Sequence, residues 1–304
     1  MKKNIFCLSG LLLFCLLSSC HQPCCKPSAG LIADGATLQE ISTEFKFTEG
    51  PAADAAGNVY FTDQPNDRIL VYTIDGSLKT FMQPAGRANG LYFHPDGSLL
   101  ACADEKSELW KIDVKTKEHV VLASTYAGRR LNATNDVWLR PGGGIYFTDP
   151  YYQRPWWDHQ SPTQDGEHVY FLSPDLKTLI RVTEDLLKPN GLIGTPDGKV
   201  LYVSDIQDKK IYRYRIARDG TLADKTLFCP QVSDGMTIDR CGNVYVTNDN
   251  GVTVFNPDGR QIEQIRIPQG WTSNVTFGGP DRKTLFITAA KGLYTLRMNV
   301  GGAR

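Results

Sequence analysis

The chain has 304 residues, with 33 Lys and Arg against 33 Asp and Glu, 41% hydrophobic and 10% aromatic residues, and eight cysteines. The length allows one large domain or two ordinary ones, and the composition excludes a disordered or collagen-like chain. A formal charge of zero argues against a nucleic acid or another polyanion as partner, and eight cysteines in so long a chain do not make a disulfide scaffold.

The chain begins with an export signal. Lys2 and Lys3 precede an apolar stretch from Ile5 to Leu17, and small residues follow it. This order is typical of a secretory signal, and the stretch is shorter than the roughly 20 apolar residues that a transmembrane helix needs. A plain transmembrane anchor is the alternative. Removal of the signal takes both lysines away and leaves 31 basic against 33 acidic residues.

The segment Leu17-Ser18-Ser19-Cys20 resembles the lipobox of bacterial lipoproteins. The resemblance implies that residues 1–19 are a signal peptide, that Cys20 becomes the lipidated N-terminus, and that residues 20–36 form a tether. His21 implies the outer membrane, on its periplasmic side, if the cell is Gram-negative. We therefore expect an exported lipoprotein, anchored at the cell envelope, whose membrane contact is the lipid on Cys20.

The remaining cysteines do not suggest a metal site. The mature chain keeps five besides the lipidated one: Cys24, Cys25, Cys102, Cys229 and Cys241. Their spacing matches no zinc motif, and five cannot all pair with one another. Cys102 lies in an apolar strand pattern, which predicts that it is buried rather than reactive.

Six short runs of β-branched and aromatic residues follow one another along the chain, and each comes directly after a turn signal. The runs end at Asp63, Asp104, Asp149, Asp205, Asn248 and Ala289, at intervals of 41, 45, 56, 43 and 41 residues. Short strands that repeat with a period near 45 are typical of propeller blades. No amphipathic helix of useful length interrupts them, and a β-sandwich would not generate six equal units. The sequence predicts an all-β, six-bladed β-propeller with four antiparallel strands per blade.

The last blade is one strand short within the repeat. Its strands are expected near residues 274–278, 284–288 and 292–297, and the chain then nearly ends. We expect residues 37–45 to supply the fourth, outer strand, because such closure removes exposed sheet edges. Residues 37–300 are thus predicted to form a single propeller domain.

One residue recurs at the start of each blade, 14 or 15 positions before the strand end. These residues are Glu49, Asn89, Asn135, Asn190, Asp234 and Asn274. The first strand of a propeller blade lines the central channel, so we expect these six residues to form one ring. The preference of Asn and Asp for turns and strand starts is a structural alternative. Six oxygen-bearing side chains with two negative charges favour a divalent cation, calcium before zinc, because neither His nor Cys is among them.

Within this ring, we expect Glu49, Asn190 and Asp234 to bind the cation and Asn89, Asn135 and Asn274 to face a substrate. The one long insertion, residues 150–168, follows the second strand of blade three and should cover the ring. It is rich in aromatic residues, so Trp156 is predicted to contact the substrate. A loop that packs only on itself is the alternative.

The sequence resembles the gluconolactonase branch of the SMP-30/gluconolactonase/luciferin-regenerating (regucalcin-like) superfamily. The resemblance rests on Glu49-Gly-Pro51, Ala88-Asn-Gly-Leu91, Arg130-Leu-Asn-Ala-Thr-Asn-Asp136, Tyr146-Phe-Thr-Asp-Pro150, Pro189-Asn-Gly-Leu192, Ser233-Asp-Gly-Met236 and Phe277-Gly-Gly279. It implies a six-bladed propeller that hydrolyses lactones with one divalent ion. It also implies that Glu49, Asn190 and Asp234 hold this ion, that Asp234 donates and accepts protons, and that Asn135 contacts substrate. Val137 and Ala133 depart from the regucalcin-like pattern of Gly and Arg.

The resulting functional prediction is a hydrolase of carboxylic ester bonds that opens an aldono- or gluconolactone ring. A bound calcium ion, with zinc, manganese or magnesium as alternatives, would polarise the carbonyl, and Asp234 would take a proton from the attacking water. Asp136 is a second candidate base, with a turn-stabilising role as the alternative. We expect a monomer that binds a small lactone and no nucleic acid.

Two other functions are compatible with the same ring. The ion could serve another ester or phosphotriester hydrolase, or it could be structural in a non-catalytic binding module at the cell envelope. The sequence has no Gly-x-Ser-x-Gly elbow and no Gly-x-Gly-x-x-Gly or P-loop motif, which disfavours a serine esterase and a nucleotide enzyme.

Overall fold

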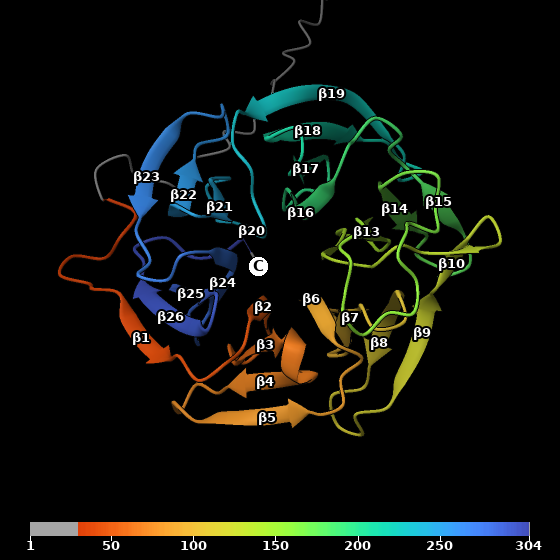
Figure 1. The fold of residues 1–304 in the computed structure, drawn as a ribbon. Coiled ribbons are helices and arrows are strands. Elements are labelled where there is room, and N and C mark those ends of the chain that lie inside the picture. The colour runs from red at the N-terminus through yellow and green to blue at the C-terminus, as the bar shows by residue number, and fades with distance from the viewer. Residues whose placement is uncertain (1–29, 304) are drawn as a thin grey trace, which may run out of the picture.

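The computed structural model describes residues 30–303, which form a six-bladed β-propeller around a central channel (Figure 1). Each blade is a four-stranded antiparallel sheet, as predicted. The first three blades are β2 (Thr48–Ala53), β3 (Val59–Asp63), β4 (Arg68–Tyr72), β5 (Leu78–Met82); β6 (Ala88–Phe93), β7 (Leu99–Ala103), β8 (Glu108–Ile112), β9 (His119–Ala123); and β12 (Val137–Leu139), β13 (Ile145–Asp149), β14 (His168–Leu172), β15 (Leu179–Arg181). The next two are β16 (Pro189–Gly194), β17 (Val200–Asp205), β18 (Lys210–Ile216), β19 (Leu222–Cys229); and β20 (Met236–Ile238), β21 (Val244–Asn248), β22 (Gly251–Phe255), β23 (Gln261–Ile265).

The last blade closes with a strand from the other end of the domain, as predicted. It consists of β24 (Thr272–Gly278), β25 (Thr284–Ala289), β26 (Gly292–Arg297) and the N-terminal β1 (Gln39–Ser42). β1 pairs antiparallel with β26, with Gln39 opposite Thr295. Contacts with this blade begin ahead of β1, because Ile32 forms a β-bridge with Met298. The predicted signal peptide, Cys20 and the first part of the tether lie outside the described residues.

Outside the blades, the described chain contains a two-stranded hairpin of β10 (Thr125–Tyr126) and β11 (Arg129–Arg130) and a short 3-10 helix, η1 (Gln64–Asn66). No helix within residues 30–303 is long and apolar enough to cross a membrane. Cys102 is fully buried and, like Cys229, is a free thiol, whereas Cys241 is disulfide-bonded.

Burial on both faces explains why the middle strands are apolar throughout. Every residue of β3, β7 and β13 is buried, because each sheet packs against a neighbouring blade on either side. Aromatic residues fill these interfaces. The Tyr60 ring of blade one lies 5.1 Å from Phe93 of blade two, and the Tyr245 ring of blade five lies 5.2 Å from Phe277 of blade six. Outer strands are more exposed, as in β9, where three of five residues are.

The innermost strands approach one another closely, and glycine makes this possible. A Cβ atom on Gly235 would lie 1.9 Å from Cγ of Asn274, and one on Gly191 would lie 2.3 Å from the backbone oxygen of Asp234. Glycine therefore directly follows Asn190 and Asp234, where the next blade passes. This packing brings the first residues of the blades around one narrow channel.

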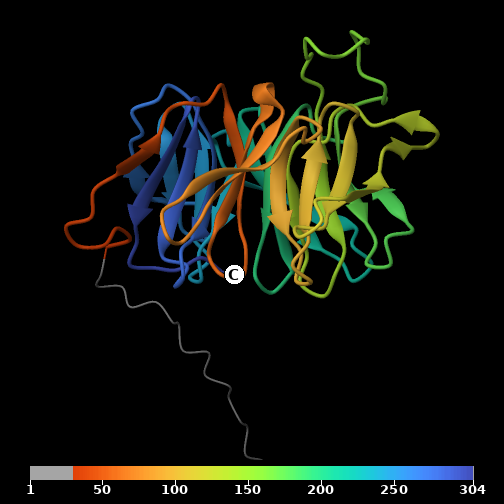
Figure 2. The same cartoon turned by 90° about the horizontal axis from the view of Figure 1, so that it is seen from below.

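The two faces of the propeller differ. Figure 2 shows the loop of residues 150–168, in light green, standing above one face, with the C-terminus on the opposite face. On that opposite face the last residues are held by backbone hydrogen bonds, from Gly302 to Arg282 (2.9 Å) and from Ala303 to Ile238 (3.0 Å). The loop face is the one on which β3 and β13 end.

Candidate active site

The six predicted ring residues lie at the loop end of the channel, at one level. Glu49 and Asn274 pair with Thr62 and Thr288, each one residue before a strand end. The backbone N–H groups of Asn135 and Asp234 donate at 2.9 Å to the carbonyls of the equivalent threonines. Five ring side chains are 3 to 6% exposed, and that of Asp234 is half-buried. The structure thus assembles the ring that the repeat predicts.

Glu49, Asn190 and Asp234 form a cluster within this ring. Burial raises the pKa of Glu49 well above its ordinary value, and the negative charge of Asp234 raises it further. Burial also raises the pKa of Asp234 to about 6, against the hydrogen bonds from Trp271 and Asn190, the positive charge of Arg154 and the hydrogen bond with Glu49, which lower it. Two carboxyl groups this close cannot both be charged without a compensating cation. The cluster is therefore a site that favours positive charge.

Each member of the cluster is oriented by a hydrogen bond to one of its atoms. Oε2 of Glu49 accepts hydrogen bonds from the Gly50 N–H (2.7 Å) and from Asn274 (3.2 Å). Nδ2 of Asn190 donates to the Tyr152 hydroxyl at 3.0 Å, and Oδ1 of the same amide is buried without a partner. This leaves a set of oxygen atoms suited to a hard divalent cation.

Whether the ring can hold a metal cation depends on the side-chain amide of Asn190. Within residues 30–303, no group of three or more His, Cys, Asp or Glu side chains is placed to hold a metal ion. The ring offers two carboxylates and needs Asn190 as the third ligand. The unpartnered Oδ1 of Asn190 is the observation that makes this ligand set fit.

Asp136 lies beside the ring but is already engaged. Its Oδ1 accepts the N–H of Val137 at 3.0 Å, and its Oδ2 accepts the N–H of Leu192, in the next blade, at 3.1 Å. Burial raises its pKa to about 7. Because both oxygens hold backbone N–H groups, the arrangement supports a role in joining blades three and four more than a role as a base.

The three other asparagines differ in what their side chains contact. Asn274 donates to Glu49 and accepts the N–H of Val275, so its amide positions a member of the acidic cluster. Asn89 and Asn135 are bound through their backbone carbonyls, to Thr62 (3.1 Å) and Gly90 (2.7 Å). Their side-chain amides have no hydrogen bond with another described residue. They are the members of the ring best placed to meet a ligand.

The insertion of residues 150–168 covers one side of the ring, as its position in the repeat predicts. Tyr152 reaches Asn190, and the Arg154 guanidinium lies 5.7 Å from the ring centres of both Tyr152 and Trp156. Trp156, predicted to bind substrate, is half-buried beneath Arg87, at 4.4 Å, and its Nε1 is buried without a partner. The loop is therefore built onto the neighbouring blades and does not pack only on itself.

One further residue of the site carries no signal in the repeat. Nε1 of Trp271 donates to Oδ2 of Asp234 at 2.6 Å. Trp271 lies in the turn before β24, outside the six-residue pattern. Only its position three residues ahead of Asn274 could have drawn attention to it.

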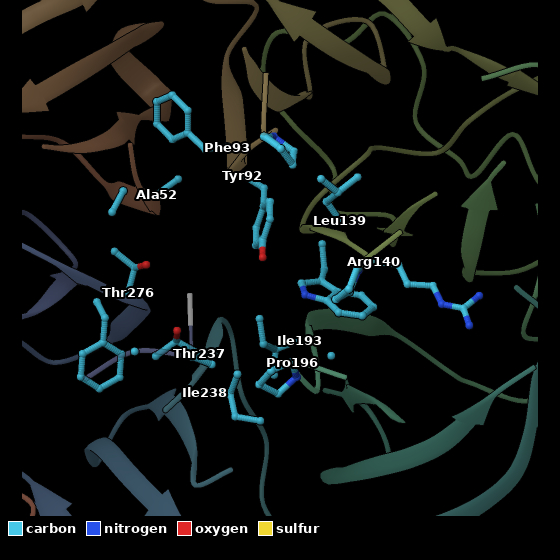
Figure 3. A pocket seen from close by; sticks show the side chains of 18 of the residues that line it. Ala52, Tyr92, Phe93, Leu139, Arg140, Ile193, Pro196, Thr237, Ile238 and Thr276 are labelled. Carbon is cyan, nitrogen blue, oxygen red and sulfur yellow. The ribbon is translucent and has the colours of Figure 1, made fainter. Parts of the chain in front are cut away.

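The other end of the channel has a different chemistry. A cavity of about 470 Å³ lies there. Figure 3 shows the ring of Tyr92 and the side chains of Ile193 and Ile238 around it. Its walls come from the same inner strands, because Tyr92 and Ile193 lie three residues after Asn89 and Asn190. The walls are mainly apolar, with polar side chains such as His94, Thr237 and Arg140 among them, and no Asp or Glu within residues 30–303 lines the cavity. The polar ring is therefore the better candidate for a cation site.

The fold and this ring define a class: six-bladed propellers with an acidic, oxygen-rich small-molecule site in the channel. The chain belongs to the SMP-30/Gluconolactonase/LRE-like family, which it matches over residues 47–291. Gluconolactonase of Zymomonas mobilis is 29% identical over an alignment of 306 positions, gaps included, which covers 91% of this chain and 85% of that protein.

Two solved structures are similar to this chain. A gluconolactonase from Xanthomonas campestris is 30% identical, with a TM-score of 0.82 over 88% of this chain and 91% of that one. Regucalcin from Agrobacterium tumefaciens, a calcium-binding protein, has a TM-score of 0.73 at 18% identity, over 88% of this chain and 95% of that one. At this identity the second likeness is one of fold.

Proposed function

We propose that this protein is a sugar lactonase, a hydrolase of carboxylic ester bonds that opens the ring of an aldono- or gluconolactone. The lactonase activity follows from the family and from gluconolactonase relatives that align over most of the chain. The observation that carries the proposal is the cluster of the buried Glu49 carboxyl group, the half-buried Asp234 carboxyl group and one unpartnered amide oxygen at the mouth of the channel. Such a site can bind a cation and activate water.

Glu49, Asn190 and Asp234 would hold the cation. Calcium is the first candidate because all three ligands are oxygen atoms, with zinc, manganese and magnesium as alternatives. When bound, a divalent cation polarises the lactone carbonyl and stabilises the negative charge that develops on its oxygen. It would also lower the pKa of Asp234, so that this side chain is a carboxylate at neutral pH.

The chain's own residues then handle the proton and the substrate. Asp234 accepts a proton from water as the water oxygen bonds to the carbonyl carbon. The bond from this carbon to the ring oxygen breaks, and Asp234 returns the proton to the departing oxygen, which yields a hydroxy acid. Trp271 holds the carboxylate in place through Oδ2. The amides of Asn89 and Asn135 would bind the lactone hydroxyl groups.

A titration of acid release tests the proposal. Purified protein without residues 1–19 would be mixed with D-glucono-1,5-lactone, with calcium or with chelator, and spontaneous hydrolysis would be subtracted. We expect calcium-dependent turnover that Asp234→Asn lowers by at least a hundredfold. Full turnover of this variant would rule out Asp234 as the base. Hydrolysis of a phosphotriester but of no lactone would indicate the other hydrolase. Stabilisation by calcium without any hydrolysis would indicate a binding module.

We also propose that the mature protein is an envelope lipoprotein, held by a lipid on Cys20. The support is the order of residues 2–20, which lie outside the described structure. Metabolic labelling with a palmitate analogue should mark the wild-type protein and not Cys20→Ala, which should move to the soluble fraction. A labelled Cys20→Ala protein, or an unlabelled wild type, would contradict the assignment.

A further inference from the structure

The insertion of residues 150–168 places the positively charged side chain of Arg154 at the mouth of the channel. Arg154 lies over the ring of Tyr152, at 5.7 Å, and the hydroxyl of this tyrosine accepts a hydrogen bond from Asn190 in the polar ring. The guanidinium is therefore one aromatic side chain away from a proposed cation ligand. A molecule bound at the polar ring would meet it next.

The side chain of Arg154 is fixed by contacts with Asp104 and Trp156. Its Nε donates to Oδ2 of Asp104 at 2.8 Å, and Asp104 is 1% exposed. Trp156 packs on it at 5.7 Å and is in turn covered by Arg87 at 4.4 Å. Trp157 ties the insertion to the same aspartate, because its Nε1 donates to the backbone oxygen of Asp104 at 3.0 Å. A side chain with this support loses little conformational freedom when it binds a ligand.

Asp104 departs from the role that its position has in other blades. In blades one, three and four the strand-end aspartates accept two successive backbone N–H groups from the segment that enters the blade. These are Lys46 and Phe47 on Asp63, Asn132 and Ala133 on Asp149, and Leu187 and Lys188 on Asp205. Within residues 30–303, the Asp104 carboxylate accepts no backbone N–H group, and it binds Gln64 (2.9 Å) and Arg154 instead. In blade two, the strand-end aspartate thus binds the side chain of Arg154 in the insertion, in place of the backbone N–H groups that the equivalent aspartates bind in blades one, three and four.

The outer nitrogens of Arg154 remain available. Among residues 30–303, nothing accepts a hydrogen bond from Nη1 or Nη2, and the side chain is 22% exposed. A guanidinium held through Nε presents two parallel donors that match the two oxygens of a carboxylate. A neutral hydroxyl group would use only one of them. The arrangement is built for an oxyanion.

We propose that Arg154 is a specificity-determining residue that binds an oxyanion, above all a carboxylate, on the part of the substrate outside the lactone ring. The preferred substrate is then an anionic sugar lactone. This inference rests on the proposed function, because it places the lactone ring at the polar cluster. Asp104, which does not reach the substrate, acts as the positioning residue for Arg154.

Paired substrates test this inference. We would compare kcat and KM for D-glucaro-1,4-lactone, which carries a carboxylate, with those for neutral D-glucono-1,4-lactone, which has the same ring size, in calcium-loaded protein. The wild type should prefer the charged lactone by about tenfold or more in kcat/KM. Arg154→Gln should remove this preference through KM and change the neutral substrate less than threefold. Arg154→Lys should retain part of it, because the charge stays and the paired donors are lost.

Two more variants distinguish the positioning of Arg154 from a general effect of positive charge on the protein. Asp104→Asn should weaken the preference while Arg154 is still present, because the guanidinium loses its anchor. Arg213→Gln removes a positive charge from an exposed side chain on β18, which contacts Thr226, and should leave both substrates unchanged. Melting temperatures would show that each variant is folded. An equal loss for both lactones in Arg154→Gln, or no loss for either, would overturn the inference.

A binding measurement keeps this test separate from the proposed function. Calorimetry should show that calcium-loaded wild type binds glucarate more tightly than gluconate and that Arg154→Gln binds the two alike. If neither lactone is hydrolysed but this difference in binding holds, the lactonase proposal fails and the oxyanion site stands. If both are hydrolysed and glucarate has no advantage in binding or turnover, the oxyanion site fails alone.

Discussion

At the residue scale, each of the three proposed cation ligands has one polar side-chain atom hydrogen-bonded to the protein and another left for a ligand. Oδ2 of Asp234 is bound to Trp271, Oε2 of Glu49 to Gly50 and Asn274, and Nδ2 of Asn190 to Tyr152. Each of these bonds sets the direction of the remaining oxygen before a ligand arrives. Prior orientation of this kind is what lets a site bind a cation and polarise a substrate at small entropic cost.

Trp271→Phe tests the orientation of the base. The change removes one donor to a carboxylate, and such a hydrogen bond contributes about 1.5–3 kcal/mol. The pKa of Asp234 should rise, because Trp271 makes the largest contribution that lowers it. The acidic limb of the profile of kcat/KM against pH should therefore move to higher pH, with a loss of roughly tenfold at neutral pH.

Trp110→Phe is the matched control, since its Nε1 also donates to a carboxylate at 2.6 Å, that of Glu108 on an outer part of blade two. It should lower the melting temperature without moving the pH profile. If both variants shift the profile alike, the effect comes from general loosening and not from Trp271.

At the scale of elements, the inner strands carry the ring and glycine sets their spacing. β20 and β24 lie so close that Gly235 meets the Asn274 amide. The Asn274 amide in turn donates to Glu49. A side chain at Gly235 would therefore act on the acidic cluster through one intermediate residue.

Gly235→Ala should cost about 1–3 kcal/mol of unfolding free energy, because the added methyl group overlaps Asn274. It should also weaken calcium binding, since a displaced Asn274 no longer holds Glu49. Urea unfolding and calcium calorimetry would measure the two effects. Gly270→Ala is the control, because a Cβ atom there meets nothing within 4 Å. Similar losses in both variants would contradict the argument.

The closing strand is the other element on which the fold depends. β1 completes blade six through β26, and Phe45, just after it, is buried against Phe61 at a ring distance of 5.3 Å. Deletion of residues 37–45 should lower the unfolding free energy by about 3–5 kcal/mol, through lost ladder hydrogen bonds and one buried aromatic side chain. A peptide of residues 37–45 added in excess should restore part of the loss. An unchanged melting temperature would show that blade six closes without β1.

At the scale of the whole molecule, the proposed cation joins blades one, four and five. Its ligands are far apart in the chain, so binding would cross-link the propeller across the channel. Calcium should raise the melting temperature in proportion to the logarithm of its concentration above the dissociation constant. In the unliganded protein the positive charge of Arg154 and the hydrogen bond from Trp271 offset the burial of Asp234 only in part, since the pKa values of Asp234 and Glu49 stay raised.

The raised pKa values of the two carboxyl groups predict that a rise in pH lowers the stability of the calcium-free protein and increases the stabilisation by calcium. The pKa of Asp234 is about 6 in the folded protein against an ordinary 3.8, and that of Glu49 is also raised. Between roughly pH 4 and 6, the folded state holds protons that the unfolded state has released, so stability in chelator should fall as pH rises. The stabilisation by calcium should grow over the same range, because protons compete with the cation.

Differential scanning calorimetry from pH 4.5 to 7.5, with calcium or chelator, measures both effects. The raised pKa values of Asp104, Asp136 and Asp149, about 6, 7 and 7, add to the first effect but not to the calcium difference. Glu49→Gln with Asp234→Asn should abolish the calcium difference at every pH. A difference that persists in this double variant would place the cation elsewhere.

Much of the molecule follows from its repeat. Strand ends spaced near 45 residues determine the number of blades, and the shortage of one strand at the end predicts closure by residues 37–45. The same count predicts the ring, because equal positions in equal blades must lie at one level. The family resemblance and the oxygen-only composition then indicate a cation and a lactone.

The tertiary structure alone decides how the ring is used. Trp271 meets Asp234 across 37 residues and Arg154 meets Asp104 across 50, from a turn and an insertion that have no counterpart in the repeat. Periodicity predicts where a strand residue lies, but it carries no information about which residues the side chains of an irregular loop contact. The same limit applies to Asp136, whose carboxylate contacts a neighbouring blade. The sequence by itself determined the propeller and its polar ring, and the packing of loops and adjacent blades decided which atoms of that ring are free to react.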